Sequence, residues 1–358
     1  MITGNKGEWS EIYALFKLLG DKKVFVGDAN LKRIEELFYP IMKILRNESD
    51  RNYEYTVDSD IILISGSGEE LRIPVGVFQD QAANLLESIR NATGASFDIP
   101  ETEEFMRSVQ CRTLKAASTD KTDIKIVIHD SRTKLQPTLG FSIKSHLGGA
   151  STLLNAGRTT NFVYKISGIT LTDSQVSEIN SISTRSKIKD RVNRIIELGG
   201  ILEPVGLEQS IFHNNLVLID SRLPNILSET VRLYYSSNES TIESLVNSIE
   251  ENNPLNFDTE FNHPFYEYKI KKFLTDVALG MMPASVWSGI YEANGGYLVV
   301  KEDGDILCYH IYNKNEFENY LFSNTKLETA SSSKHGFGLI EKKKHDFLIK
   351  LNLQIRFR

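Results

Sequence analysis

The sequence is poor in cysteine and lacks any long apolar run. Its 358 residues include two cysteines, and Cys111 and Cys308 fit no metal-ligand spacing. No apolar stretch approaches the roughly eighteen residues that a membrane-spanning helix needs. The first residues also lack the apolar core and small-residue cleavage site of a secretory signal. We therefore expect a cytoplasmic protein with reduced thiols and no membrane partner.

Several common catalytic motifs are missing as well. The sequence contains no P-loop, no GxGxxG between a strand and a helix, no HExxH and no CxxC. Ser210 and His213 are neighbours without a nucleophile elbow, which disfavours a serine hydrolase. Nucleotide-dependent, zinc-protease and thiol-redox chemistries are therefore not indicated.

Charge is distributed unevenly along the chain. The net charge of −6 argues against a purely electrostatic binder of nucleic acid. Residues 131–194, however, hold ten Lys and Arg against three Asp and Glu, whereas residues 233–268 hold seven acids and no Lys or Arg. The basic segment favours a DNA or RNA partner, although an uneven surface without function gives the same pattern.

Hydrophobic periodicity predicts an α/β protein with a strand-rich C-terminal part. The expected helices cover 7–20, 77–92, 100–114, 173–198 and 207–235. The expected strands cover 23–26, 38–45, 53–64, 122–128, 140–145, 162–167, 297–301, 306–312 and 347–358. We expect a core over 1–235, an acidic Ser- and Asn-rich connection over 236–262, and a part over 263–358 that packs on the core.

The most informative segment is a predicted hairpin with Asp123 at the start of one strand and Lys144 on the other. Alternation places Ser142 and Lys144 on one face, and antiparallel pairing brings Asp123 to the same end. A carboxylate that holds Mg²⁺ beside an ammonium is the chemistry of metal-dependent phosphodiester hydrolysis. A surface hairpin with solvated charges has the same pattern, so this segment alone makes the chain only a nuclease candidate.

A second carboxylate is needed, because Ser142 occupies the position two before the lysine where an acid would share the metal. Glu11 is the preferred donor, and it shares a helix face with Glu8 one turn away. A solvated helix face is the alternative for both glutamates. Asp120 and Asp130, which flank the same strand, are weaker substitutes.

Polar segments downstream suit a nucleic-acid surface. A loop rich in amides and hydroxyls surrounds Arg158, and the last strand alternates apolar residues with amides and cations but no carboxylate. A basic helix edge over 185–194 and a basic Ser-rich loop over 331–336 suit phosphate contact. The predicted nucleic-acid contacts are Asn155, Arg158, Thr160, Asn161, Lys334, His335, Asn352, Gln354 and Arg356. Ordinary loop and edge-strand composition remains the alternative for these residues.

The chain resembles the HpaII family of type II restriction endonucleases. The resemblance is carried by residues 5–11 (NKGEWSE), 139–145 (LGFSIKS), 152–157 (TLLNAG), 159–162 (TTNF) and 350–357 (KLNLQIRF). These segments cover both ends and the middle, so the match extends over the whole chain. It implies a PD-(D/E)XK nuclease core over 1–235, with a mixed central sheet flanked by helices, that cuts double-stranded DNA at the palindrome CCGG with Mg²⁺. It also implies a cognate cytosine methyltransferase that protects host DNA. A palindromic target fits a homodimer, with a monomer that nicks the two strands in turn as the alternative.

The chain departs from the PD-(D/E)XK pattern at two positions. Thr122 precedes Asp123 where the pattern has proline, and Ser142 replaces the acid before Lys144. Some nucleases of this kind carry such a serine and recruit a glutamate from elsewhere. The resemblance therefore implies that Asp123, Glu11 or Glu8, and the backbone carbonyl of Ile143 hold the metal, while Lys144 activates water and Ser142 assists.

Two other functions remain open at this point. A structure-specific or repair nuclease on the same core cuts without regard to CCGG. A non-catalytic DNA-binding protein, in which the serine reflects a dead site, binds the duplex and never cuts it. Cleavage products distinguish the three.

Overall fold

The structure, a computed structural model, describes residues 1–358 apart from 49–50, 67, 69, 116–121 and 132. The described chain forms two compact units. Unit 1 comprises Met1–Ser151 and Tyr291–Tyr320, and unit 2 comprises Thr152–Ile290 and Leu321–Arg358. Unit 2 is thus largely an insertion into unit 1, which differs from the expected boundaries at 235 and 262.

Unit 1 is built on one large mixed sheet. Among the described residues its nine strands run in the order β2-β14-β13-β9-β8-β3-β4-β5-β6. The strands are β2 (Lys23–Gly27), β3 (Arg33–Asn47), β4 (Asn52–Asp58), β5 (Ile61–Ser65), β6 (Leu71–Pro74), β8 (Ile124–Ile128), β9 (Thr138–Ser145), β13 (Gly296–Val300) and β14 (Ile306–His310). β8 and β9 are antiparallel, whereas β13 lies parallel to β9. The predicted hairpins at 124–145 and 297–312 are both confirmed.

The sheet curls instead of remaining open, because β3 is long enough to pair twice. Its first half pairs with β2 over 33–40, and its second half pairs with β8 and β4 over 41–47. The β2–β3 pairing closes six strands, in the order β2-β14-β13-β9-β8-β3, into a barrel-like sheet. The expected mixed α/β architecture is therefore correct, and the closure is a feature that local periodicity did not reveal.

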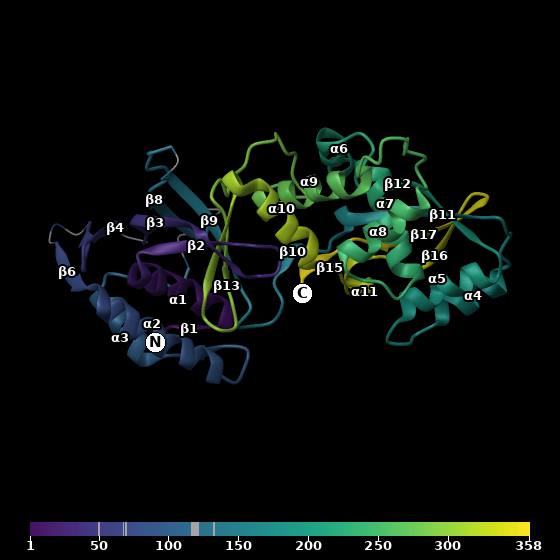
Figure 1. Ribbon diagram of the computed structural model, residues 1–358. Coiled ribbons are helices and arrows are strands. Elements are labelled where there is room, and N and C mark those ends of the chain that lie inside the picture. The colour runs from purple at the N-terminus through teal and green to yellow at the C-terminus, as the bar shows by residue number, and fades with distance from the viewer. Residues whose placement is uncertain (49–50, 67, 69, 116–121, 132) are drawn as a thin grey trace. The chain divides into compact units, whose positions relative to one another are not determined.

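Helices and short elements complete unit 1. They are β1 (Thr3–Gly4), α1 (Lys6–Asp21), α2 (Val75–Asn91), β7 (Phe97–Asp98), α3 (Pro100–Ser108), η2 (Ile311–Asn313) and the start of α10 (Lys314–Ser323). α1 packs beside α2 and against β9 (Figure 1). The apolar positions that predicted this helix, Trp9, Ile12, Phe16 and Leu19, are all fully buried. Burial of that face fixes α1 on the sheet, and with it the glutamates that the helix carries.

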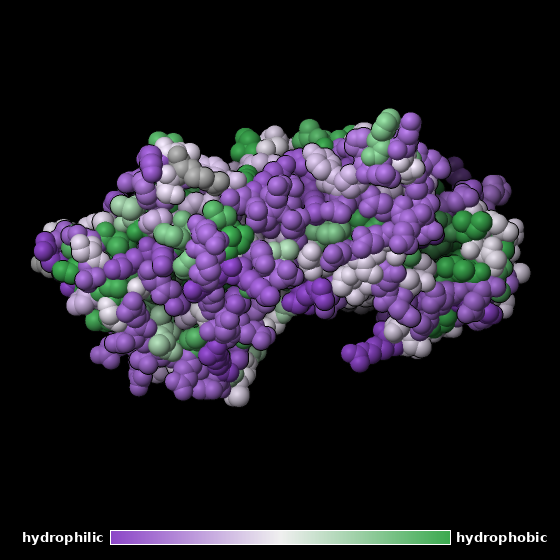
Figure 2. Space-filling view, in the orientation of Figure 1, coloured by the Kyte–Doolittle hydropathy of each residue, from purple (hydrophilic) through white to green (hydrophobic). Residues whose placement is uncertain are grey.

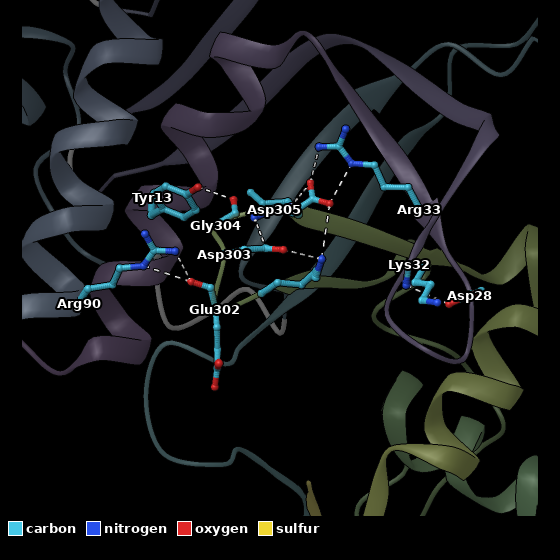
Figure 3. A network of polar contacts seen from close by, with 11 residues as sticks. Tyr13, Asp28, Lys32, Arg33, Arg90, Glu302, Asp303, Gly304 and Asp305 are labelled. Atoms are coloured by element: carbon cyan, nitrogen blue, oxygen red, sulfur yellow. Dashed lines mark hydrogen bonds and ion pairs between the residues drawn. The ribbon is translucent and has the colours of Figure 1, made fainter.

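A polar network fastens the β13–β14 turn to the rest of unit 1 (Figure 3). The Tyr13 hydroxyl donates to the Gly304 carbonyl, and the Arg90 guanidinium donates to the Glu302 carbonyl. Arg33 pairs bidentately with Asp305 at 2.6 and 2.8 Å. Gly304 has a φ of +85°, and a Cβ there would lie 2.4 Å from a methyl group of a neighbouring leucine. The turn therefore requires glycine, and it holds β13 in place beside β9.

Unit 2 contains two smaller sheets and most of the remaining helices. The sheets run β12-β11-β17-β16 and β10-β18-β15. The strands are β10 (Thr152–Leu154), β11 (Asn161–Ser167), β12 (Ile201–Leu207), β15 (Thr325–Leu327), β16 (Ile340–Lys343), β17 (Asp346–Asn352) and β18 (Ile355–Phe357). The helices are η1 (Arg158–Thr160), α4 (Asp173–Ser181), α5 (Lys187–Glu197), α6 (Ser210–Ile219), α7 (Leu223–Ser236), α8 (Ile242–Asn252), α9 (Phe265–Leu279) and α11 (Ser332–His335).

The structure differs from the expected surface connection over 236–262. That segment contains α8, whose residues Ile242, Leu245, Val246 and Ile249 are buried. Their spacing is that of one helix face, and the acidic residues between them obscured it. The part over 263–358 also does not form one body, because Tyr291–Tyr320 completes unit 1. The expected last strand is divided into β17 and β18, which belong to different sheets.

The surface carries mixed side chains. Figure 2 shows hydrophilic residues over most of the face in view, with hydrophobic residues in separate patches. In the described part of the chain, no helix is both long and apolar enough to cross a membrane.

Candidate active site and nucleic-acid interface

α1 places two glutamates close to β9. Asn5 and Glu8 form a capping box, in which the Glu8 amide donates to Asn5 Oδ1 at 3.0 Å and the Asn5 amide donates to Glu8 Oε2 at 2.8 Å. Such a cap stabilises a helix by about 1 kcal/mol. The Ser10 and Ser145 hydroxyls lie 2.8 Å apart and join α1 to β9. Glu11, one residue further along the helix, is thereby held over this end of the sheet.

The β8–β9 hairpin brings Asp123 and Lys144 together as the alternation predicted. Ile124 pairs with Phe141, which places Asp123 at the level of Ser142. The Ile143 amide donates to Asp123 Oδ2 at 2.6 Å, so the carboxylate is fixed against β9 while its other oxygen makes no hydrogen bond to a described residue. The Lys144 ammonium lies 4.9 Å from the centre of the Tyr297 ring on β13. All these groups belong to unit 1.

Electrostatics show that Glu11, Asp123 and Lys144 interact. Burial, and next the charge of Asp123, raise the pKa of Glu11 from its ordinary value of 4.5 to about 8. Burial lowers the pKa of the Lys144 ammonium, and the charges of Asp123 and Glu11 oppose that shift. The Glu11 carboxyl has no hydrogen-bond partner among the described residues. Two carboxylates and one ammonium thus share a half-buried site in which a divalent cation would relieve carboxylate repulsion.

Glu8 differs from Glu11 although the two share a helix face. A hydrogen bond from the Asn5 backbone, and then one from Lys115, lower the pKa of Glu8. Lys115 Nζ lies 2.9 Å from Glu8 Oε1. Glu8 therefore already serves the helix cap and an ion pair, which leaves Glu11 as the better-placed second carboxylate.

Lys115 is a feature of the site that the sequence did not indicate. It follows a predicted helix and belongs to no motif, so only the three-dimensional arrangement brings it to Glu8. Its charge also acts on Glu11 and Asp123, and the hydrogen bond to Glu8 raises its pKa.

A cavity of about 700 Å³ opens at this site. Glu8, Glu11, Lys115 and Ile143 line it, together with the glycine-containing segment 147–149. Asp123 and Lys144 are not among its lining residues. The cavity gives a ligand access to Glu11 and to Ile143, both of which were predicted to face the metal.

The donors present suit a magnesium ion better than a metal that needs an all-protein cage. Among the described residues, no three His, Cys, Asp or Glu side chains are grouped to hold a metal. Mg²⁺ is commonly bound by one or two carboxylates with water and substrate phosphates. Asp123 and Glu11, whose charges interact, are two carboxylates of this kind.

The weaker substitutes for the second acid find little support. Asp130 is buried and accepts a hydrogen bond of 2.8 Å from the Thr133 hydroxyl in its own turn. Asp120 lies outside the described residues.

The predicted nucleic-acid contacts all lie in unit 2, and three of them are buried. Thr160, Asn161 and Asn352 are at most 1% exposed. Asn352 Nδ2 donates to Asn161 Oδ1 at 2.7 Å and to Thr160 Oγ1 at 3.1 Å. Asn161 Nδ2 donates to the His335 carbonyl at 2.9 Å. In this structure the hydrogen bonds of these three side chains hold the surrounding loops together.

Cations on the polar face of the last strands are paired with acids, although residues 347–358 themselves contain no Asp or Glu. Lys350 pairs with Glu208 at 3.1 Å, and Arg356 pairs with Glu328 at 2.7 Å. These acids come from other segments, which an inspection of one strand does not reveal. Arg356 is therefore not a free cation in this structure, whereas Gln354 is half-buried.

Three predicted contacts remain accessible around the buried network. Asn155, Arg158 and Lys334 are exposed, and His335 is half-buried. The Arg158 guanidinium lies within 4 Å of a Cβ built on Gly336, so the two loops are neighbours. The network thus joins 157–161 to 331–336 and presents cations on both loops.

Comparison with known proteins gives an independent result. The family model described as HpaII restriction endonuclease matches residues 5–357. The type II restriction enzyme HpaII of Haemophilus parainfluenzae is 50% identical over 358 residues, which covers 99% of this chain and 98% of that protein. No solved structure matches the chain.

Proposed function

This chain belongs to the HpaII restriction endonuclease family and is a type II restriction endonuclease, and on that premise we propose that it cleaves double-stranded DNA at CCGG with Mg²⁺. The observation that carries the proposal is 50% identity over 99% of the chain to the enzyme HpaII. An identity that extends over both units includes the segments that would bind DNA as well as those that would cut it.

Unit 1 serves as the PD-(D/E)XK nuclease core in this proposal. In support, β3, β8 and β9 are successive antiparallel neighbours, and β13 adds parallel to β9. The candidate acid precedes β8, and the Ser-x-Lys element lies on β9. This assignment replaces the expected core over 1–235, since unit 1 includes Tyr291–Tyr320 and excludes Thr152–Ile290.

The metal would be held by Asp123, Glu11 and the Ile143 carbonyl. When bound, Mg²⁺ supplies positive charge that polarises a phosphoryl oxygen and acidifies a bound water. The Ile143 amide pre-positions Asp123. Burial and Asp123 raise the pKa of Glu11, so a bound cation would displace the Glu11 proton and ionise that carboxyl. Glu8 is the alternative ligand, which would first have to release Lys115.

Lys144 is the residue that we expect to act on the attacking water. The charges of Asp123 and Glu11 act on its ammonium, and burial lowers its pKa, which makes proton exchange with water easier than for an exposed lysine. The water attacks phosphorus, the bond to the 3′ oxygen breaks, and the products are a 5′ phosphate and a 3′ hydroxyl. Ser142 lies on the same face of β9 and can hydrogen-bond the water.

The DNA-reading surface is assigned to the accessible cations of unit 2. Arg158 and Lys334 lie on the two loops that the Asn161–Asn352 network joins. Arginine hydrogen-bonds guanine bidentately, and CCGG offers two guanines on each strand. Asn155 and His335 would complete the contacts. Gln354, a further predicted contact, lies between β17 and β18.

A palindromic target suggests two protomers related by a two-fold axis, each of which binds one half. We expect a cognate cytosine methyltransferase to protect host DNA at the same sequence. Because DNA inside the cell is the substrate, we expect the enzyme to act in the cytoplasm.

The test is to incubate the protein with unmethylated plasmid and Mg²⁺ and to map the ends. Parallel reactions contain EDTA or CpG-methylated plasmid. We expect discrete fragments with 5′-phosphate ends at CCGG that disappear in both controls. Cuts without regard to CCGG would indicate a repair nuclease. An intact plasmid that nevertheless shifts on a gel would indicate that Ser142 marks a binding protein without activity.

A further inference from the structure

A basic cavity lies in unit 2, apart from the nucleic-acid contacts assigned above. It has a volume of about 510 Å³ and lies between the start of α5 and the segment 329–333. Its charged lining residues are Arg185, Lys187 and Lys189. A second cavity of about 320 Å³ shares Lys187 with it, along with two serines of the 331–333 segment. The two segments are about 140 residues apart in sequence, so folding alone creates this site.

The lining of the larger cavity has the chemistry of an anion site. None of the described residues that line it is Asp or Glu. Hydroxyl groups alternate with the cations, since four serines and Thr329 contribute to the wall. Lysine and arginine with serine and threonine hydroxyls are the side chains that most often contact phosphates of nucleic acid.

Two of the three cations are not neutralised by the protein. Within the described chain, Arg185 and Lys187 take part in no ion pair. Lys189 is fixed, because it donates to the Ser237 carbonyl at 2.8 Å and lies 4.4 Å from the centre of the Tyr234 ring. By contrast Arg194, two turns further along α5, pairs with Glu178 at 3.0 Å and with Glu197 at 3.3 Å. Uncompensated positive charge is therefore concentrated at the cavity end of the helix.

The walls of the cavity are also firmly attached. Arg191 is buried and donates to the Gly338 carbonyl at 2.8 Å, and to the Asn180 and Ile182 carbonyls at 2.8 and 2.7 Å. These bonds join α5 to the chain that follows α11. A pre-organised wall keeps the entropic cost of binding low.

The segment 331–333 leads directly to the predicted contacts Lys334 and His335. The His335 carbonyl accepts from Asn161, which connects this segment to the loop that carries Arg158. If the base edges of a duplex contact Lys334 and His335, the backbone of the neighbouring nucleotides of that duplex passes along the same surface. The cavity is therefore within reach of the phosphates that flank a bound recognition sequence.

We propose that Arg185, Lys187 and Lys189 bind backbone phosphate of the DNA that flanks the recognition sequence. The proposal rests on the proposed function, because it takes the duplex to be the ligand. It adds a sequence-independent anchor in unit 2 to the base-reading residues. Each phosphate neutralised by such a cation releases counterions, so the contribution depends on salt.

The test compares Lys187→Gln with Arg194→Gln, which remove the same charge from the same helix. The equilibrium dissociation constant is measured with Ca²⁺ on a CCGG duplex and on a duplex without CCGG, from 50 to 200 mM salt, with thermal unfolding as a check on folding. For Lys187→Gln we expect roughly tenfold weaker binding to both duplexes. The slope of log affinity against log salt should fall by about 0.9. Arg194→Gln should bind as the wild type does.

Two further variants keep the interpretation unambiguous. Arg185→Gln combined with Lys187→Gln should lower the slope by about twice as much, and Lys187→Arg should restore it because the charge remains. An unchanged slope for Lys187→Gln, or a loss confined to the CCGG duplex, would overturn the phosphate assignment. Failure of the wild type to bind or cut CCGG would instead reject the proposed function.

Discussion

Replacing Glu11 with glutamine removes a carboxyl group that the metal-free protein keeps partly neutral. Glu11 is half-buried beside Asp123, and its pKa rises from 4.5 to about 8. Glutamine has nearly the same shape and no charge. The change therefore removes the charge of residue 11 while its packing stays nearly the same, so any difference in the free energy of unfolding reports the electrostatic cost of burying that charge.

The sign follows from proton linkage. The unfolded chain ionises Glu11 above about pH 4.5, whereas the folded protein holds the proton until about pH 8. The side chain thus costs no stability below pH 4.5, a growing amount between pH 4.5 and 8, and the full amount above pH 8. A shift of this size corresponds to at most about 5 kcal/mol. Water that reaches a half-buried group reduces the effect, so we expect about 1–3 kcal/mol for Glu11→Gln.

Thermal and urea unfolding in EDTA, followed from pH 4.5 to 9, measure this difference. Glu11→Gln should match the wild type at the acidic end and become increasingly more stable up to pH 8. Excess Mg²⁺ should stabilise the wild type at pH 8 and leave Glu11→Gln nearly unchanged, because the variant lacks a ligand. The variant should also cut DNA far more slowly.

Glu8→Gln is the matched control on the same helix. Its pKa is lowered by the Asn5 backbone and by Lys115, so the glutamate stabilises the folded protein above its ordinary pKa. Glu8→Gln should therefore lose about 1 kcal/mol at neutral pH, with the deficit shrinking towards acid. A Glu11→Gln variant no more stable than the wild type at pH 8.5, or one whose stability still responds to Mg²⁺, would refute the reasoning.

Three other substitutions test the account. Asp123→Asn should abolish the rise in melting temperature that Mg²⁺ produces, and calorimetric titration that detects normal Mg²⁺ binding would contradict that role. Gly304→Ala should cost about 1–3 kcal/mol, because a residue at φ +85° is strained and its Cβ meets a leucine side chain; urea unfolding measures it, and a neutral result would argue against the turn as drawn in Figure 3. Asn161→Ala should lower stability by about 1–3 kcal/mol, because it removes two hydrogen bonds of a buried side chain, one from Asn352 and one to the His335 carbonyl. Asn352 keeps its hydrogen bond to Thr160, but the bond from Asn161 to the His335 carbonyl is lost, so CCGG binding should weaken as the 331–336 loop becomes disordered. Loss of protection of the 331–336 amides from hydrogen exchange would report that disorder.

Local patterns predicted much of the fold of unit 1. The spacing of Trp9, Ile12, Phe16 and Leu19 predicted α1, because an amphipathic helix must bury one face. Strict alternation on both sides of a turn predicted the β8–β9 hairpin, and with it the proximity of Asp123 and Lys144. These features depend on contacts within about twenty residues, which a sequence expresses directly.

Pairings between distant segments were not predictable in the same way. The β2–β3 pairing closes the sheet, yet nothing in either strand distinguishes this partner from another. Lys115 reaches Glu8 across more than a hundred residues. The insertion of unit 2 between Ser151 and Tyr291 likewise has no local signal, so the expected boundary at 235 followed composition rather than packing.

Amides were the least informative residues. From the sequence alone, Asn161 and Asn352 could be DNA contacts or internal hydrogen-bond donors. Both side chains are buried in the structure. Only burial distinguishes the two roles, and burial depends on the whole fold. By the same argument, the sequence alone indicates that Lys350 and Arg356 are unpaired cations, whereas the fold brings Glu208 and Glu328 to them as ion-pair partners.

The most direct test of the account is single-turnover cleavage of a short CCGG duplex by the wild type and by Lys144→Ala, with equilibrium binding measured separately in Ca²⁺. We expect near-normal binding by the variant and cleavage slower by about 10²–10⁴-fold, because the ammonium that acts on the attacking water is gone. A Lys144→Ala variant that binds normally and cuts at the wild-type rate would place the catalytic centre elsewhere in the molecule.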